Sequence, residues 1–181
     1  VNVFAPAQMQ SVSVSESGAL IDVETQEGER LALNANLLVL ADGANSPGCK
    51  TLGIHQTRHD YGQQAIVANL AFDQPHESWA FERFTQQGPL ALLPLTGNRF
   101  GMVWCMSPDQ ADQLMPLEDA DFIAQLQKSI GYRQGRISRM GERNTYPLSL
   151  IQAQEQARPH VVVLGNAAHA LHPVAGQGFN L

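Results

Sequence analysis

The first part of the chain alternates hydrophobic and polar residues with the two-residue period of half-buried strands. Serine and valine alternate over residues 11–15, and two further short alternations follow, separated by the turn pairs Ser17-Gly18 and Glu27-Gly28. This pattern predicts a three-stranded antiparallel meander with one face in water. Residues 37–40 are apolar throughout, so we expect them to form a buried strand that closes the meander.

A second group of apolar stretches, longer than the first, predicts another antiparallel sheet with a helix packed against it. Apolar residues recur at helical spacing between Asp119 and Ile130, and Gly131 ends the pattern. Between Pro108 and Pro116 we expect a loop. The expected strands are residues 65–72, 79–84, 90–95 and 100–105, with one or two more in 136–150.

Residues 161–181 carry the clearest chemical signal. An unbroken aliphatic run over 161–164 is typical of a strand covered on both faces, and Gly165 ends it. The segment 173–178 should stay open and irregular, because proline lacks an N–H group and glycine accepts positive φ angles. We expect residues 178–181 to begin a helix, whose unpaired N–H groups and partial charge of roughly +0.5 would stabilise an electron-rich cofactor edge.

The order of residues in this segment resembles the second flavin-binding fingerprint of the single-component aromatic hydroxylases, which use FAD and a reduced nicotinamide. Asn166 stands where most of that family has Asp. Together with His172 and Phe179, it resembles the branch of ubiquinone biosynthesis, most closely the 2-polyprenyl-6-methoxyphenol hydroxylases. The matched positions are Gly165, Asn166, Ala167, Ala168, His169, Pro173, Gly176, Gln177, Gly178 and Asn180.

Residues 41–46, which follow the apolar run 37–40, resemble a second fingerprint of the same family. A carboxylate at the end of a buried strand, followed by glycine, can meet a ligand that approaches the backbone closely. The resemblance implies that Asp42 and Gly43 contact both FAD and the nicotinamide donor. Leu40 and Cys49 depart from the family pattern, which commonly has Gly and Arg there.

The resemblance also implies a reaction, in which NAD(P)H is a transient reductant and a flavin C4a-hydroperoxide hydroxylates a polyprenyl phenol. It implies that Pro173 is catalytic, with its carbonyl near the flavin ring, and that Asn166 bonds to the ribityl chain. Candidates for the apolar path of the polyprenyl tail are Phe84, Leu90, Leu92 and Tyr146. The implied cofactor-binding positions are Asp42, Gly43, Gly165, Asn166, Ala167, Pro173, Gly176, Gln177, Gly178, Phe179, Asn180 and Leu181.

The expected fold class is α+β with α/β character, as part of a flavin-hydroxylase fold. Cofactor-lobe strands would flank an antiparallel substrate-lobe sheet that a helix covers. Residues 1–58 and 151–181 would form the FAD-binding lobe, and residues 59–150 the substrate-binding lobe. This division into lobes is what the resemblance implies.

Composition and charge limit the kinds of partner and the location that we expect for the protein. A formal charge of −6 without a basic stripe argues against nucleic acid, and the 44% hydrophobic and 15% charged content is that of an ordinary globular protein. The two cysteines, Cys49 and Cys105, lie far apart, so we expect reduced thiols and a cytoplasmic location. No apolar run approaches the roughly 18 residues of a membrane span. Peripheral contact with the inner membrane and assembly with other quinone-pathway enzymes stay open.

The chain opens in the middle of an expected strand, residues 1–4, without a start methionine. The family begins with a strand, G-x-G-x-x-G and a helix, and that motif does not occur in this sequence. We therefore expect a piece of a longer protein that carries the flavin-ring half of the site. The piece by itself should be inert and bind FAD weakly or not at all.

Simpler interpretations stand beside these. His169 and His172 could suggest a metal pair, although no Cys or carboxylate lies at ligand spacing nearby. Asp42 could merely cap a turn, and the apolar residues of 79–95 are more often core than pocket. Other function classes are a flavin-dependent halogenase or prenyl reductase on the same scaffold, and a non-catalytic binding module. A serine hydrolase is disfavoured, because no G-x-S-x-G occurs.

Overall fold

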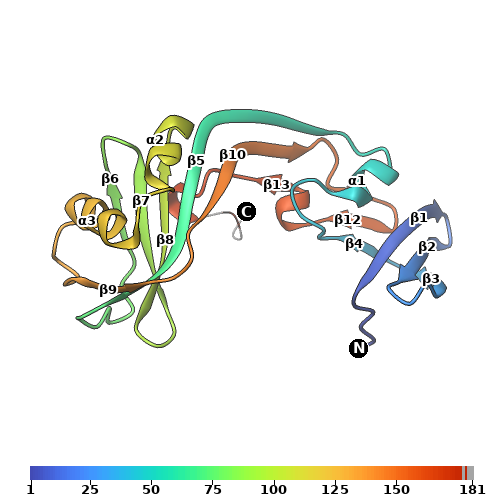
Figure 1. Cartoon of the computed structure of the whole chain (residues 1–181). Helices are drawn as coiled ribbons and strands as arrows, with labels where there is room; N and C mark the ends of the chain where they lie inside the picture. Colours follow the sequence, from blue (N-terminus) through green and yellow to red (C-terminus); the bar gives the residue numbers. More distant parts are fainter. Residues whose placement is uncertain (177, 179–181) are drawn as a thin grey trace. The chain divides into compact units, whose positions relative to one another are not determined.

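The computed structural model describes residues 1–176 and 178 (Figure 1). The chain divides into two compact units. Unit 1 comprises Val1–His59, Leu150–His172 and Gly176–Leu181, and unit 2 comprises Asp60–Ser149 and Pro173–Ala175. Their assignment to cofactor and substrate stays a prediction.

Unit 1 contains the predicted meander. Strands β1 (Ala7–Ser15), β2 (Gly18–Thr25) and β3 (Arg30–Ala35) pair antiparallel in this order. Ala19 and Ile21 are buried on one face, whereas the serines of β1 lie exposed on the other. The meander and its single wet face are confirmed. The strand expected at residues 1–4 is wrong, because regular structure begins only at Ala7.

The expected closing strand of the meander belongs to another sheet. Strand β4 (Leu38–Leu40) pairs in parallel with β12 (Val161–Val163), and β11 (Ala157–Arg158) pairs antiparallel with β12. Burial is also one-sided, because successive strand residues point to opposite faces. Leu40 is 4% exposed, whereas Val39 is 46% exposed, so the expected burial of 37–40 holds for one face only. The same correction applies to 161–164, where Leu164 is 49% exposed.

A short helix follows β4 and packs on this small sheet. Helix α1 (Pro47–Thr51) begins at Ser46, whose Oγ accepts a hydrogen bond from the Cys49 N–H at 2.9 Å. Gly48 lies so close to β4 that a side-chain carbon there would come 2.5 Å from Leu40 Cδ2. The buried core of unit 1 consists of Leu40, Cys49, Ile54, Ala153, Val161, Val163, Ala167 and Ala168.

Unit 2 is an antiparallel sheet with helices on one face (Figure 1). Its strands pair in the order β5-β8-β7-β6, and β9 pairs with the end of β5. The bounds are β5 (Gln56–Phe72), β6 (Phe81–Phe84), β7 (Pro89–Leu95), β8 (Arg99–Met106), β9 (Ile137–Met140) and β10 (Asn144–Ala153). Each predicted strand is found, although β6 begins two residues late because Glu77 and Ser78 turn the chain with positive φ angles.

Two helices supply the other half of this core. Helix α3 (Asp119–Ile130) is confirmed and ends at Gly131, which has φ 77°. The loop expected between Pro108 and Pro116 is wrong, because residues there form α2 (Pro108–Leu114). Ser107 and Gln110 form a capping box with Pro at the first turn, which is a strong local start signal. Phe122 and Leu126 of α3 are fully buried with Trp104 and Phe100 of the sheet.

A buried amide closes the loop after α3. Gln127 is 7% exposed, and its Nε2 donates to the carbonyls of Gly131 and Gly135. Its Oε1 accepts from the Ile137 N–H at 2.9 Å. One side chain therefore satisfies three backbone groups between the helix and β9. Among residues 1–176 and 178, no helix combines the length and apolar character that crossing a bilayer would require.

The Gln127→Ala variant should lower the free energy of unfolding by about 1–3 kcal/mol, because three backbone groups lose their partner in a buried place. Urea unfolding followed by circular dichroism measures the change. Gln125→Ala, on an exposed position of the same helix, is the control and should change stability little. Equal effects of the two variants would contradict the role of the buried amide.

Burial, and secondarily the charge of Glu82, raises the pKa of the Cys105 thiol from 9.0 to about 11. A raised folded pKa means that the stabilising effect is complete below about pH 9 and is lost as the pH rises toward 11. In a Cys49→Ala background, thiolate absorbance should therefore titrate near pH 11 in the native protein and near 9 in denaturant. A native midpoint near 9 would show that the thiol is solvated.

Candidate functional site

The carboxyl ends of β4 and β12 meet at one edge of the small parallel sheet. Leu40 lies opposite Val163, and the Leu164 N–H donates to the Leu40 carbonyl at 2.8 Å. Two turns therefore leave the sheet side by side, one at Asp42 and the other at Gly165. Ligands of parallel α/β sheets bind at such carboxyl edges.

The first turn holds an exposed carboxylate in a fixed place. Asp42 Oδ2 accepts a hydrogen bond from the Gly48 N–H of α1 at 2.8 Å. This contact is the capping role that the sequence left as an alternative. A carboxylate accepts more than one hydrogen bond, and Asp42 is exposed, so capacity remains for a ligand hydroxyl. Gly43, with φ 88°, follows directly.

The second turn is a single 3₁₀ turn, η1 (Gly165–Ala167). Gly165 ends the strand as predicted and has φ 58°, a value that favours glycine. Asn166 is exposed, whereas Ala167 and Ala168 are buried in the unit 1 core. The turn therefore has an inner side that packs and an outer side that presents a backbone and one amide side chain.

The outer side of both turns has room for a flat ligand. A side-chain carbon added at Gly43 or Gly165 would meet no described atom within 4 Å. Beyond the second turn, β13 (His169–Ala170) pairs with β10, and His169 Nε2 is buried without a hydrogen-bond partner among the described residues. Open backbone at both turns, the Asp42 carboxylate and the Asn166 amide suit the hydroxyl and carbonyl groups of FAD. The residues present at this edge therefore fit the cofactor.

Four implied cofactor positions lie outside the described residues, namely Gln177, Phe179, Asn180 and Leu181, and with them most of the expected helix start at 178–181. Gly176 ends the 3₁₀ turn η2 (Val174–Gly176), and Gly178 lies in a turn. Pro173 groups with unit 2, and its catalytic role stays a prediction.

The substrate candidates separate into two groups. Leu90 and Leu92 are 2% and 1% exposed in the core beneath the helices, which favours the simpler interpretation of this segment as core, and their place on an access path stays a prediction. Strand alternation explains this, because even-numbered residues of β7 face the helices. Phe84 and Tyr146 are exposed and stay predictions.

Strand alternation leaves a second apolar surface that sequence reasoning missed. On the face of the unit 2 sheet away from the helices, Val67 lies opposite Val103, and Leu93 lies opposite Gly101. These residues line a hollow of about 290 Å³ with Asn69, Leu95, Glu142 and Asn144 near it. We call this surface the open sheet face. The odd-numbered positions of the predicted strands were the signal that could have found it.

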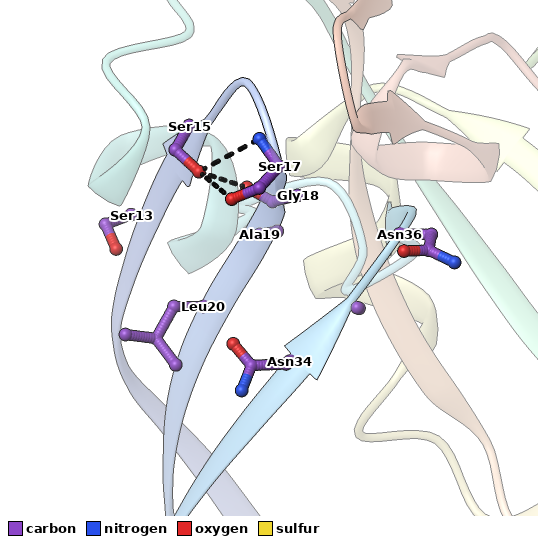
Figure 2. A pocket seen from close by; sticks show the side chains of 9 residues that line it. Ser13, Ser15, Ser17, Gly18, Ala19, Leu20, Asn34 and Asn36 are labelled. Carbon is purple, nitrogen blue, oxygen red and sulfur yellow. Dashed lines mark hydrogen bonds between the residues drawn. The ribbon is translucent and has the colours of Figure 1, made fainter.

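A hollow lined mainly by polar residues lies on the meander of unit 1. Figure 2 shows Ser13, Ser15, Asn34 and Asn36 around Leu20 on the exposed side of the meander. Two serine hydroxyls of this hollow bond to each other within the turn between β1 and β2, since Ser15 Oγ lies 2.8 Å from Ser17 Oγ. Across residues 1–176 and 178, no group of three or more His, Cys, Asp or Glu side chains is arranged to hold a metal ion.

Curated relatives share the sequence over nearly the whole chain. The uncharacterized protein slr1300 of Synechocystis is 37% identical over 98% of this chain and 43% of its own length. The ubiquinone hydroxylase UbiL of Rhodospirillum rubrum is 34% identical over 98% of this chain and 40% of its own length. The Escherichia coli 3-demethoxyubiquinol 3-hydroxylase is 32% identical over 90% of this chain and 41% of its length. The chain thus spans less than half of each of these relatives.

Solved structures show the same fold at low identity. The flavin-dependent halogenase CmlS matches with a TM-score of 0.75 and 13% identity, over 97% of this chain and 33% of its own. Aklavinone-11 hydroxylase, solved with FAD and aklavinone, matches with a TM-score of 0.72 and 16% identity, over 96% and 34%. The predicted fold class, part of a flavin-hydroxylase fold, is confirmed.

The sequence profile described as FAD binding domain matches residues 1–181. This match covers both turns of the carboxyl edge and the whole of unit 2. It also agrees with the flavin fingerprints read from residues 41–46 and 165–180. The chain therefore belongs to the FAD binding domain family, whose cofactor is FAD.

Proposed function

We propose that the protein containing this chain is an FAD-dependent monooxygenase that hydroxylates a polyprenyl phenol in ubiquinone biosynthesis, with NAD(P)H as reductant. The observation that carries the proposal is the carboxyl edge of β4 and β12, where Asp42 and Asn166 lie on neighbouring turns with open backbone between them. Relatives named as ubiquinone hydroxylases support the reaction class and the pathway.

In this proposal, the chain's own residues bind and orient the cofactor. Asp42 accepts hydrogen bonds from cofactor hydroxyls while α1 holds its other oxygen. Asn166 bonds to the ribityl chain, and Gly165 lets the backbone approach closely. Bound FAD supplies the acceptance of electrons from the reductant and the activation of dioxygen.

The open sheet face suits the apolar part of the substrate. Leu93 is 44% exposed and Leu95 37%, and both line the hollow together with Gly101, which has no side chain. Glu142 and Asn144 supply polar atoms for a ring hydroxyl. An apolar wall with few polar groups is typical of ligand sites. Hydroxylation of an electron-rich ring depends more on orientation of the ring and exclusion of water than on an acid–base pair.

The carboxyl edge is tested in the full-length protein. Asp42→Ala should raise the FAD dissociation constant roughly tenfold or more, because the site loses a charged hydrogen-bond acceptor. The increase in flavin fluorescence when FAD is released measures the dissociation constant. Asp60→Ala is the matched control, since Asp60 is also exposed and accepts one glycine N–H at 2.8 Å, from Gly62. A full-length wild-type protein that purifies colourless and takes up no FAD would refute the proposal.

The open sheet face is tested by turnover. Leu93→Ser should lower kcat/KM for a prenylated phenol roughly tenfold, because the apolar contact is worth about 1–3 kcal/mol. Mass spectrometry identifies the product as one oxygen heavier than the substrate. Leu20→Ser, an exposed leucine of the meander, should leave turnover unchanged. A chlorinated product in the presence of chloride would point instead to halogenation on this scaffold.

A further inference from the structure

The turn that presents Asn166 is anchored by a side chain from a distant part of unit 1. Gln56, the first residue of β5, donates from Nε2 to the Ala167 carbonyl at 2.8 Å, across 111 residues of sequence. Gln56 is partly buried, and the carbonyl belongs to the fully buried Ala167. A turn of this length leaves its last carbonyls without partners in the turn itself. Gln56 supplies that partner.

The backbone that carries Gln56 is fixed at the preceding residue. The His55 carbonyl accepts a hydrogen bond from the Gln154 N–H at 2.9 Å. The amide of Gln56 therefore starts from a held position, which lowers the entropy lost when it bonds to the turn.

The other hydrogen bonds of the turn leave the Ala167 carbonyl without a partner. The Ala168 N–H donates to Gly165, and the Ala153 N–H donates to Ala168, which ties the far end of the turn to unit 1. Neither bond involves the carbonyl of Ala167. The Gly165 carbonyl, in the peptide unit that precedes Asn166, is held from within the turn, and the Gln56 amide holds the carbonyl two residues further on. The two bonds together set the tilt at which Asn166 faces outward.

We propose that Gln56 is a positioning residue for flavin binding, and that its amide sets the direction in which the Gly165–Ala167 turn presents its outer side. The inference rests on the proposed function of this edge. Gln56 does not touch the cofactor in this proposal. It acts through the turn, so its loss changes the geometry of binding and leaves the fold intact.

The test uses the full-length protein with three substitutions. Gln56→Met keeps the length and removes the donor, Gln56→Glu replaces the donor by an acceptor, and Gln56→Lys restores a donor. The FAD dissociation constant should rise about tenfold in the Met variant and more in the Glu variant, the size expected for one hydrogen bond at a fixed site. In the Lys variant it should return to within about threefold of wild type.

Thr57→Val is the matched control, because it removes an exposed hydrogen bond of the same segment, from Thr57 Oγ1 to the Gln152 carbonyl at 3.3 Å, that does not touch the turn. It should leave the FAD dissociation constant within about twofold. The visible circular dichroism of bound flavin reports its orientation, and should change in the Met and Glu variants but not in Thr57→Val. Equal FAD affinity and an unchanged flavin spectrum in the Glu variant would overturn the inference. Wild-type protein without FAD binding would instead refute the proposed function.

Discussion

The candidate site depends on the parallel pairing of β4 with β12. These strands are separated by more than a hundred residues, and their contact brings Leu38 opposite Val161 and Leu40 opposite Val163. Burial of Leu40, Val161 and Val163 stabilises the pairing, because apolar area removed from water contributes about 25 cal/mol per Å². Without it, Asp42 and Gly165 would lie on unrelated loops.

The small residues around this pairing link packing to binding. Gly48 lets α1 lie against Leu40, and α1 in turn holds the carboxylate of Asp42. Ala167 and Ala168 pack the inner side of the second turn against the core, and Asn166 stays exposed on the outer side. The same contacts that stabilise unit 1 therefore orient its polar groups. In unit 2, strand alternation separates a core under the helices from the open sheet face in the same way.

Much of the fold could be predicted from local pattern. The meander, the strands of unit 2 and the helix ending at Gly131 follow from periodicity and turn residues that act over a few positions. Helix α2 was missed although Ser107 and Gln110 form a capping box, because Pro108 and Pro116 were interpreted as loop residues. Leu90 and Leu92 show a different limit, since hydrophobicity does not tell which face of a sheet a residue occupies.

The sequence by itself determined most of the elements and the family, because propensity, capping and glycine turns are local properties, and the order of residues from Gly165 to Gly178 matches a flavin fingerprint. Only the tertiary structure decided which strands are neighbours and which faces are covered. It placed residues 37–40 beside β12 and not on the meander, and it joined Gln56 to Ala167. Both results depend on contacts between residues more than a hundred positions apart, and local periodicity carries no information about such contacts.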